Sequence, residues 1–137
     1  MINRLDQAIE KKNEPELQAC IAALFNQTEQ IDKAYYPKIE RLLFEKWHHE
    51  HEDIVGLIWL KELKDNRFIE PIMLIAQQRE IYRLYDDELE SALRKCVHVL
   101  KSIASELSNS AVKKLLDTGN ENVKYALENY RWNSTPC

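Results

Sequence analysis

The fold is decided by the stretch Trp59-Leu60-Lys61-Glu62-Leu63-Lys64-Asp65-Asn66-Arg67-Phe68-Ile69-Glu70-Pro71-Ile72. It reads as the end of one helix, a turn, and a second helix that packs back on the first, because Asp65 and Asn66 favour turns and caps and a proline is tolerated in a first helical turn. A partly similar pattern recurs about 40 residues later, from Val99 to Leu116. Helix pairs that recur at such a spacing are typical of helical solenoids, whose units bury their apolar faces against their neighbours. The sequence therefore predicts a stack of helix pairs, an architecture that mostly binds other macromolecules.

The composition favours an all-helical chain. Its 137 residues include only two glycines and four prolines, too few for the many reversals of a β-sandwich or barrel. Charged residues make up 31% and hydrophobic residues 45%, which is the balance of a folded chain. The formal net charge of −4 argues against nucleic acid as the main ligand, because phosphate binding needs a basic face. It is compatible with a basic protein partner.

The sequence also predicts a protein without a membrane span. The longest apolar run, from Pro71 to Ala76, is far shorter than the ~20 residues that cross a bilayer. The first six residues carry charges where a secretory signal has its apolar core. Cys20 and Cys96 fall on apolar helix faces and Cys137 is the last residue, so no disulfide framework is indicated. We expect a cytoplasmic protein.

Apolar residues at helical spacing predict about seven or eight helices in a single domain, residues 1–137. Asn13 is placed to cap the second helix. A third helix is expected to restart at Thr28 and to be kinked or broken at Pro37. From Ile54 to Leu63 the chain is apolar nearly all round, so this helix should be buried between its neighbours.

The longest apolar stripe lies in the second half of the chain. The segment from Asp87 to Glu90 resembles a capping box at its start. Ser108 and Asn109 are expected to end the helix, and Gly119 suits the left-handed position after the helix that follows. The stripe consists of Leu89, Ala92, Leu93, Cys96, Val97, Leu100, Ile103 and Leu107.

The stretch from Leu60 to Ile72 resembles a HEAT-like repeat of the short bacterial type, in which an Ala/Leu-rich helix ends in an Asp-containing turn and the next helix opens near a proline. The segments from Asp86 to Ile103 and from Asp117 to Leu127 resemble further units. The resemblance covers residues 50–131, with residues 1–49 as divergent first units and residues 132–137 as a polar tail. It implies a right-handed α-α superhelix of the HEAT/armadillo kind that acts as a protein-binding module.

Small, acidic, stand-alone HEAT-like proteins include bacterial immunity proteins that neutralise a cognate toxin, so the resemblance favours that function. In it, a curved acidic surface occludes the basic active-site surface of a toxin such as a nuclease, and electrostatic steering speeds capture. A scaffold or adaptor subunit of a cellular complex is the alternative, and a lyase-type enzyme comes third. No paired carboxylates, glycine-rich phosphate loop or nucleophile elbow is evident. We expect a monomer that is not an enzyme and holds no cofactor.

The first candidate site is the cluster Trp47-His48-His49-Glu50-His51-Glu52-Asp53. On a continuous helix His48 would share one face with His51 and Glu52, where the three side chains can hold a metal ion. The two-histidine helical zinc motif is absent. A solvated loop between helices is therefore favoured over a partner-contact patch, and a metal site comes last.

Aromatic and acidic side chains at two polar junctions predict the partner-binding surface. Tyrosine and tryptophan contribute much interface energy, because each buries a large rigid surface and keeps a polar group. Together with the carboxylates they predict an acidic rim that suits a basic protein. The candidate residues are Trp47, His48, Glu50, His51, Glu52, Asp53, Tyr82, Tyr85, Asp86, Asp87, Glu88 and Trp132.

Overall fold

The computed structural model describes the backbone of residues 1–134 and the side chains of residues 1–129. Over these residues the chain forms helices and no strand, which confirms the predicted all-helical class. This part of the chain contains nine α-helices, more than the predicted seven or eight. They are α1 (Ile2–Glu10), α2 (Glu14–Asn26), α3 (Tyr36–Phe44), α4 (His51–Leu60), α5 (Ile69–Gln77), α6 (Arg79–Tyr82), α7 (Ser91–Ile103), α8 (Glu106–Leu116) and α9 (Glu121–Ser134).

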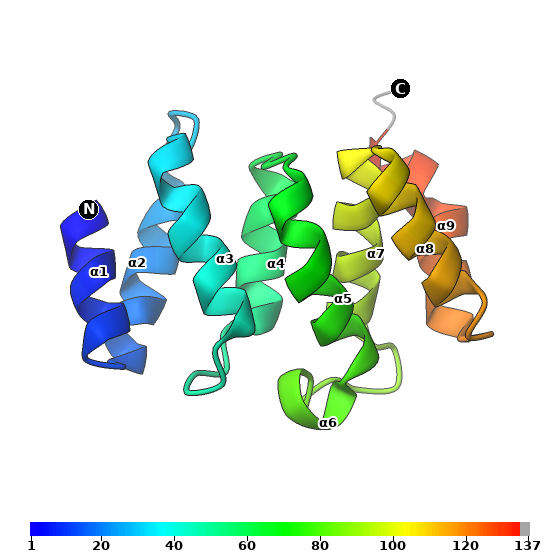
Figure 1. Cartoon of the computed structure of the whole chain (residues 1–137), viewed down its shortest axis with the longest axis horizontal. Helices are drawn as coiled ribbons and strands as arrows, with labels where there is room; N and C mark the ends of the chain where they lie inside the picture. The colour runs from blue at the N-terminus through cyan, green and yellow to red at the C-terminus, as the bar shows by residue number, and fades with distance from the viewer. Residues whose placement is uncertain (135–137) are drawn as a thin grey trace.

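The longer helices stand side by side in two layers (Figure 1). In one layer α2 packs on α4, α4 on α7, and α7 on α9. In the other layer α3 packs on α5 and α5 on α8, while α1 packs against α2. The short helix α6 and the loops on either side of it project beyond the ends of the other helices (Figure 1). This projection is the one large departure from the regular two-layer arrangement.

The apolar core lies between the two layers, and α4 is at its centre. Ile54, Val55, Leu57 and Ile58 are all buried, as the nearly all-round apolar pattern of this helix predicted. Leu60 at its end is exposed. α4 contacts α2, α3 and α7, so its burial comes from neighbours in both layers.

The turn after α4 has the predicted helix-turn-helix form. Glu62 adopts a left-handed conformation (φ 55°), and the Leu63 amide donates to the Ile58 carbonyl oxygen at 2.9 Å. The Asp65 side chain then accepts from an amide of a short 3-10 helix (Asn66–Phe68) that leads into α5. Pro71 stands in the first turn of α5, where its missing amide hydrogen breaks no helical bond.

The predicted helix start at Thr28 is wrong. Residues 27–32 are non-helical, and the chain enters α3 through a second 3-10 helix (Lys33–Tyr35). The Ala34 amide of this helix donates to the Asp32 side chain. Pro37 lies in the first turn of α3 and therefore does not kink it.

The long apolar stripe of the second half is divided between two helices. Ala104 is left-handed (φ 54°) and ends α7, and Ser105 caps α8 through reciprocal bonds with Ser108. Ser108 is thus inside a helix and does not end one. Leu89 precedes α7 and Leu107 lies in the first turn of α8, and both are exposed.

Among the described residues, no helix has the length and apolar character that crossing a bilayer requires.

Candidate functional site

The connection from α3 to α4 is held by two buried histidines. The His48 Nε2–H donates to the Leu42 carbonyl oxygen at 2.8 Å, and the His51 Nε2–H donates to the Glu45 carbonyl oxygen at 2.7 Å. The two rings stack with centroids 4.4 Å apart, and the His48 Nδ1 accepts from the Glu50 amide at 3.0 Å. The side chains therefore tie the connection back onto the end of α3.

The expectation of a solvated loop is wrong for His48, Glu50 and His51, which are buried, whereas His49 and Asp53 are exposed. His48 is 1% exposed and His51 is 4% exposed. Burial lowers the pKa of His48, and burial together with the neighbouring His48 lowers the pKa of His51 to about 4. Both rings are therefore neutral at pH 7, and each uses its Nε2 to donate to a carbonyl. Among the described residues, no group of three His, Cys, Asp or Glu side chains is placed to hold a metal ion.

The loop from α6 to α7 is organised by Arg83, which the sequence analysis did not single out. Its buried guanidinium donates to the carbonyl oxygens of Ile75 and Ala76 at the end of α5, at 2.9 Å each. It also pairs with Asp86 at 2.7 Å and Glu90 at 3.0 Å. An arginine in a loop between helices carries no periodic signal, so only the fold identifies its role.

Asp86, and not Asp87, caps α7. Glu90 is left-handed (φ 45°), so the helix cannot extend back through the predicted capping box and begins at Ser91. The Asp86 carboxylate accepts from the Ala92 amide at 3.1 Å as well as from Arg83. The Asp87 carboxylate instead accepts from the Leu89 amide, within the loop.

Two of the acidic candidates form ion pairs with basic side chains of the same chain, Asp86 in a buried pair and Glu52 in a partly exposed one. Asp86 is paired with Arg83, and Glu52 accepts from Lys95 Nζ and from the Ser91 hydroxyl at 2.8 Å each. The predicted acidic rim is therefore reduced to Glu50 and Asp53 on one side of the α3–α4 connection and to the exposed pair Asp87 and Glu88 on the other. The side chain of the remaining candidate, Trp132, lies outside the described residues, as does Cys137.

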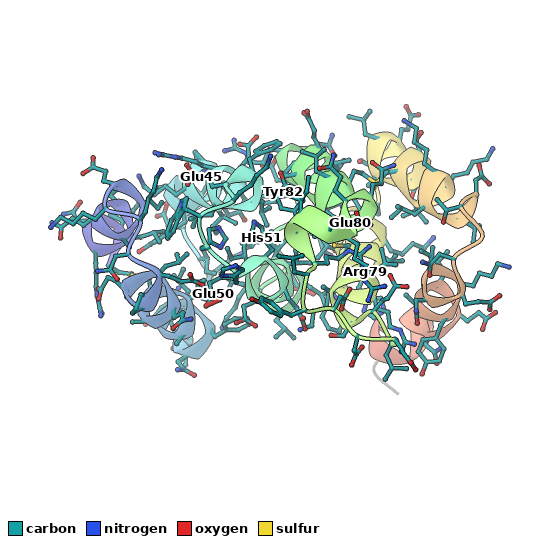
Figure 2. The ribbon with its side chains drawn as sticks, turned by 90° about the horizontal axis from the view of Figure 1, so that it is seen from below. Glu45, Glu50, His51, Arg79, Glu80 and Tyr82 are labelled. Atoms are coloured by element: carbon teal, nitrogen blue, oxygen red, sulfur yellow. The ribbon has the colours of Figure 1, made fainter. Side chains whose placement is uncertain are left out.

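The two polar junctions predicted from sequence meet at one pocket of about 130 Å³. The His51 ring contacts the Tyr82 ring edge-on, with centroids 5.1 Å apart, and Figure 2 shows these two side chains between α4 and α6. The exposed His49 ring contacts Tyr85 in the same way at 5.6 Å. The pocket is lined by Lys46, His48, His49, His51, Glu52, Ile81, Tyr82, Arg83, Leu84, Tyr85, Asp86 and Ala92.

Large apolar side chains gather on the projecting segment beside this pocket. Of the nine exposed large apolar residues among those described, four lie between positions 81 and 89, and Tyr85 is 81% exposed. Ile81, Leu84 and Tyr85 fall outside every apolar stripe that the sequence pattern assigned to the core. Apolar residues outside such a stripe and next to the turn residues Asp86 and Asp87 were the sequence signal for this exposed group. We call this group the α6 surface: Ile81, Leu84, Tyr85 and Leu89.

In comparisons with protein-family models, with curated proteins and with solved structures, nothing matches this chain. A function therefore has to be inferred from the geometry of the site.

Proposed function

We propose that this chain is a protein-binding module that engages its partner through the α6 surface and the pocket beside it. The observation that carries the proposal is the concentration of exposed large apolar side chains on a projecting segment. A contiguous apolar patch that is rimmed by polar groups marks an interaction site, because leaving it in water is unfavourable. Tyr85 supplies the kind of rigid aromatic contact that dominates interface energies.

The two-layer stack of helices supports a HEAT-like solenoid as the scaffold for this function. Arg83 ties the segment that carries α6 to the end of α5, and such a tie reduces the conformational entropy that is lost when a partner binds. Asp87 and Glu88 flank the apolar residues and are exposed, which favours a partner with a basic surface.

The specific form that we propose is neutralisation of a toxin whose active-site surface is basic. The opposite charges steer the two proteins together and the apolar side chains then hold them. A scaffold subunit would use the same surface but would leave the activity of its partner intact. Cell growth therefore separates the two: a neutralising protein restores growth to cells that express the partner, and a scaffold does not.

Affinity capture with matched variants tests the proposal. Leu84→Ser combined with Tyr85→Ser removes the centre of the α6 surface, whereas Leu107→Ser changes an equally exposed leucine on α8. We expect a protein that the wild type and the Leu107 variant retain, that the double variant loses, and that forms a defined complex after purification. Equal retention by all three proteins would rule out the α6 surface as the binding site.

A further inference from the structure

A second concave site lies on the other side of the α3–α4 connection. It is a groove of about 480 Å³ between α2 and α4. His49, His51 and Glu52 line the pocket at α6, whereas Glu50 and Asp53 line this groove. Glu50 and Asp53 are three residues apart at the start of α4, so they share one face of the helix. Figure 2 shows Glu50 and His51 next to each other there. From α2 the groove is lined by Gln18, Ile21, Ala22 and Phe25.

Glu50 is buried without a cation beside it. Its exposed fraction is 9%, and among the described residues no lysine, arginine or histidine forms an ion pair with Glu50 or Asp53. Burial, reinforced by the nearby Asp53, raises the pKa of Glu50, while a hydrogen bond with Gln18 opposes that rise. Burial without a cation makes the ionised form of Glu50 unfavourable, so a cation that entered the groove would stabilise it.

Two lysines near this region, Lys61 of the α4 C-cap and Lys95 of α7, pair with other groups. Lys95 lies over Gly56 of α4, which the Phe25 ring also approaches, and it pairs with Glu52. Lys61, at the far end of α4, donates to the carbonyl oxygen of Gln27. Among the described residues, neither lysine therefore forms an ion pair with the two carboxylates of the groove.

The lining of the groove combines two kinds of surface. Ile21, Ala22 and Phe25 offer apolar contacts for an aliphatic stem, and the face of an aromatic ring also attracts a cation. Glu50 and Asp53 offer carboxylate oxygens, and Gln18 offers an amide. A long cationic side chain presents the matching sequence of groups, an aliphatic stem that ends in a guanidinium or ammonium.

We propose that the groove between α2 and α4 binds an arginine or lysine side chain of the protein partner, with its cationic head at Glu50 and Asp53 and its stem on Phe25 and Ile21. That the bound cation belongs to a protein partner rests on the proposed function. That a cation binds at Glu50 and Asp53 rests on the residues that line the groove.

Titration with small cations, followed by amide NMR shifts, tests the pairing. Butylguanidinium and butylammonium carry the head and stem of arginine and lysine, and butylurea matches them without the charge. At constant ionic strength, we expect saturable shifts at residues 18, 25, 50 and 53 with the two cations and none with butylurea. Equal shifts with butylurea, or no saturable shift with either cation, would overturn the proposal.

Variants that remove one carboxylate each show whether the cations bind at Glu50 and Asp53. Glu50→Gln and Asp53→Asn, made separately, each remove one carboxylate, and we expect each to weaken butylguanidinium binding by about tenfold. Asp53 is exposed, so its variant remains informative if the buried position tolerates no change. Asp87→Asn with Glu88→Gln is the matched control at a remote acidic pair. An equal loss in that control would mean diffuse attraction and no site.

The proposed function and the proposed cation site can be overturned independently of each other. If the Leu84→Ser/Tyr85→Ser variant still binds butylguanidinium but no partner contacts the α6 surface, the groove stands and the proposed function is wrong. If a partner binds through the α6 surface and its affinity is unchanged in both Glu50→Gln and Asp53→Asn, the function stands and the assignment of the groove is wrong.

Discussion

Arg83 joins three parts of the fold through one buried guanidinium. It satisfies two carbonyls that α5 leaves without helical partners, and it pairs with Asp86 and Glu90 on the way into α7. Glu90 in turn accepts from Asn120 and Asn122 at the start of α9. Burial works against the ionised form of Glu90, but the bonds from Arg83, Asn120 and Asn122 together lower its pKa.

Replacing Arg83 should therefore be costly. We expect Arg83→Met to lower the free energy of unfolding by about 3–5 kcal/mol, because it leaves two carboxylates without their cation and two carbonyls without donors. Arg67→Met is the control, since the Arg67–Asp65 ion pair is far more exposed than the pairs of Arg83, and its effect should stay within about 0.5 kcal/mol. Urea denaturation measures both. Similar losses in the two variants would contradict the role given to Arg83.

The buried histidines predict a loss of stability in acid. The pKa of His51 is about 4 in the folded protein and about 6.5 in the unfolded chain, so between these values the unfolded state binds more protons. The free energy of unfolding should therefore be unaffected by His51 above pH 6.5 and should fall by about 3 kcal/mol as the pH drops towards 4. The lowered pKa of His48 acts in the same direction.

Urea denaturation at a series of pH values checks this prediction. His51→Gln keeps an N–H that can donate to the Glu45 carbonyl and removes the titrating ring. We expect the variant to lose a large part of the slope between pH 6.5 and 4. An unchanged slope would show that His51 does not titrate as its burial implies.

Sequence reasoning failed at these residues for a physical reason. Histidines that are interspersed with glutamates have the composition of an exposed loop, and nothing local shows that the carbonyls of Leu42 and Glu45 lie where the rings can reach them. Their burial is a property of how the connection folds back on α3. Arg83 was missed in the same way, since its partners belong to separate helices.

The turns between helices are built largely without glycine. Lys12, Glu62 and Ala104 occupy left-handed conformations after α1, α4 and α7, and only Gly119, after α8, has the residue type that suits this geometry. After both α1 and α4 an amide donates to a carbonyl five residues earlier, at 2.9 Å. Two separate helix pairs thus turn by the same device.

Glycine at such a position should stabilise the fold. Glu62 is exposed, and Glu62→Gly relieves the left-handed strain, so we expect the free energy of unfolding to rise by about 0.5–1 kcal/mol. Lys113→Gly, at an exposed position inside α8, should lower it by about 1 kcal/mol. Thermal and urea denaturation compare the two. A loss at both positions would show that Glu62 makes contacts that outweigh its backbone strain.

Elements that depend on local chemistry were predictable. Asn13 caps α2 by accepting from the Glu16 amide, Asp65 caps the turn before α5, and Gly119 is left-handed after α8, all as the sequence indicated. The start of α7 was not predictable, because Asp86 is fixed as its cap by Arg83 and by the left-handed Glu90. A tertiary contact there overrides the local capping signal of Asp87.

At the scale of the whole molecule, the all-helical class follows from composition and periodicity, whereas the meeting of the two polar junctions follows only from the packing of α6 against α4. Sequence spacing placed function at these junctions, and the structure adds that they line one pocket. It also shows that the groove between α2 and α4 adjoins the junction from His48 to Asp53. The structure thus brings the candidate residues of the two junctions together and leaves fewer of their carboxylates without an ion pair than the sequence predicted.

Charge at the rim of the α6 surface should affect the rate of association. Replacing Asp87 and Glu88 with lysine is expected to slow binding of a basic partner by about tenfold at low salt and to weaken the dependence of the rate on salt. Stopped-flow or surface measurements at several salt concentrations check this. Asp86 is unsuitable for the test, because its loss would uncap α7 and remove one of the two carboxylates that pair with Arg83. An unchanged association rate would show that Asp87 and Glu88 do not attract the partner electrostatically.

The most direct test of the central claim is the dissociation constant of the purified partner complex, measured by calorimetry for the wild type, for Leu84→Ser/Tyr85→Ser and for Leu107→Ser. If the α6 surface is the centre of the interface, the double variant should bind about 30-fold or more weakly than the wild type, since truncation of a central contact costs about 2 kcal/mol or more. The Leu107 variant should bind as the wild type does. Equal affinities for all three proteins would contradict the claim that this chain binds its partner through the α6 surface.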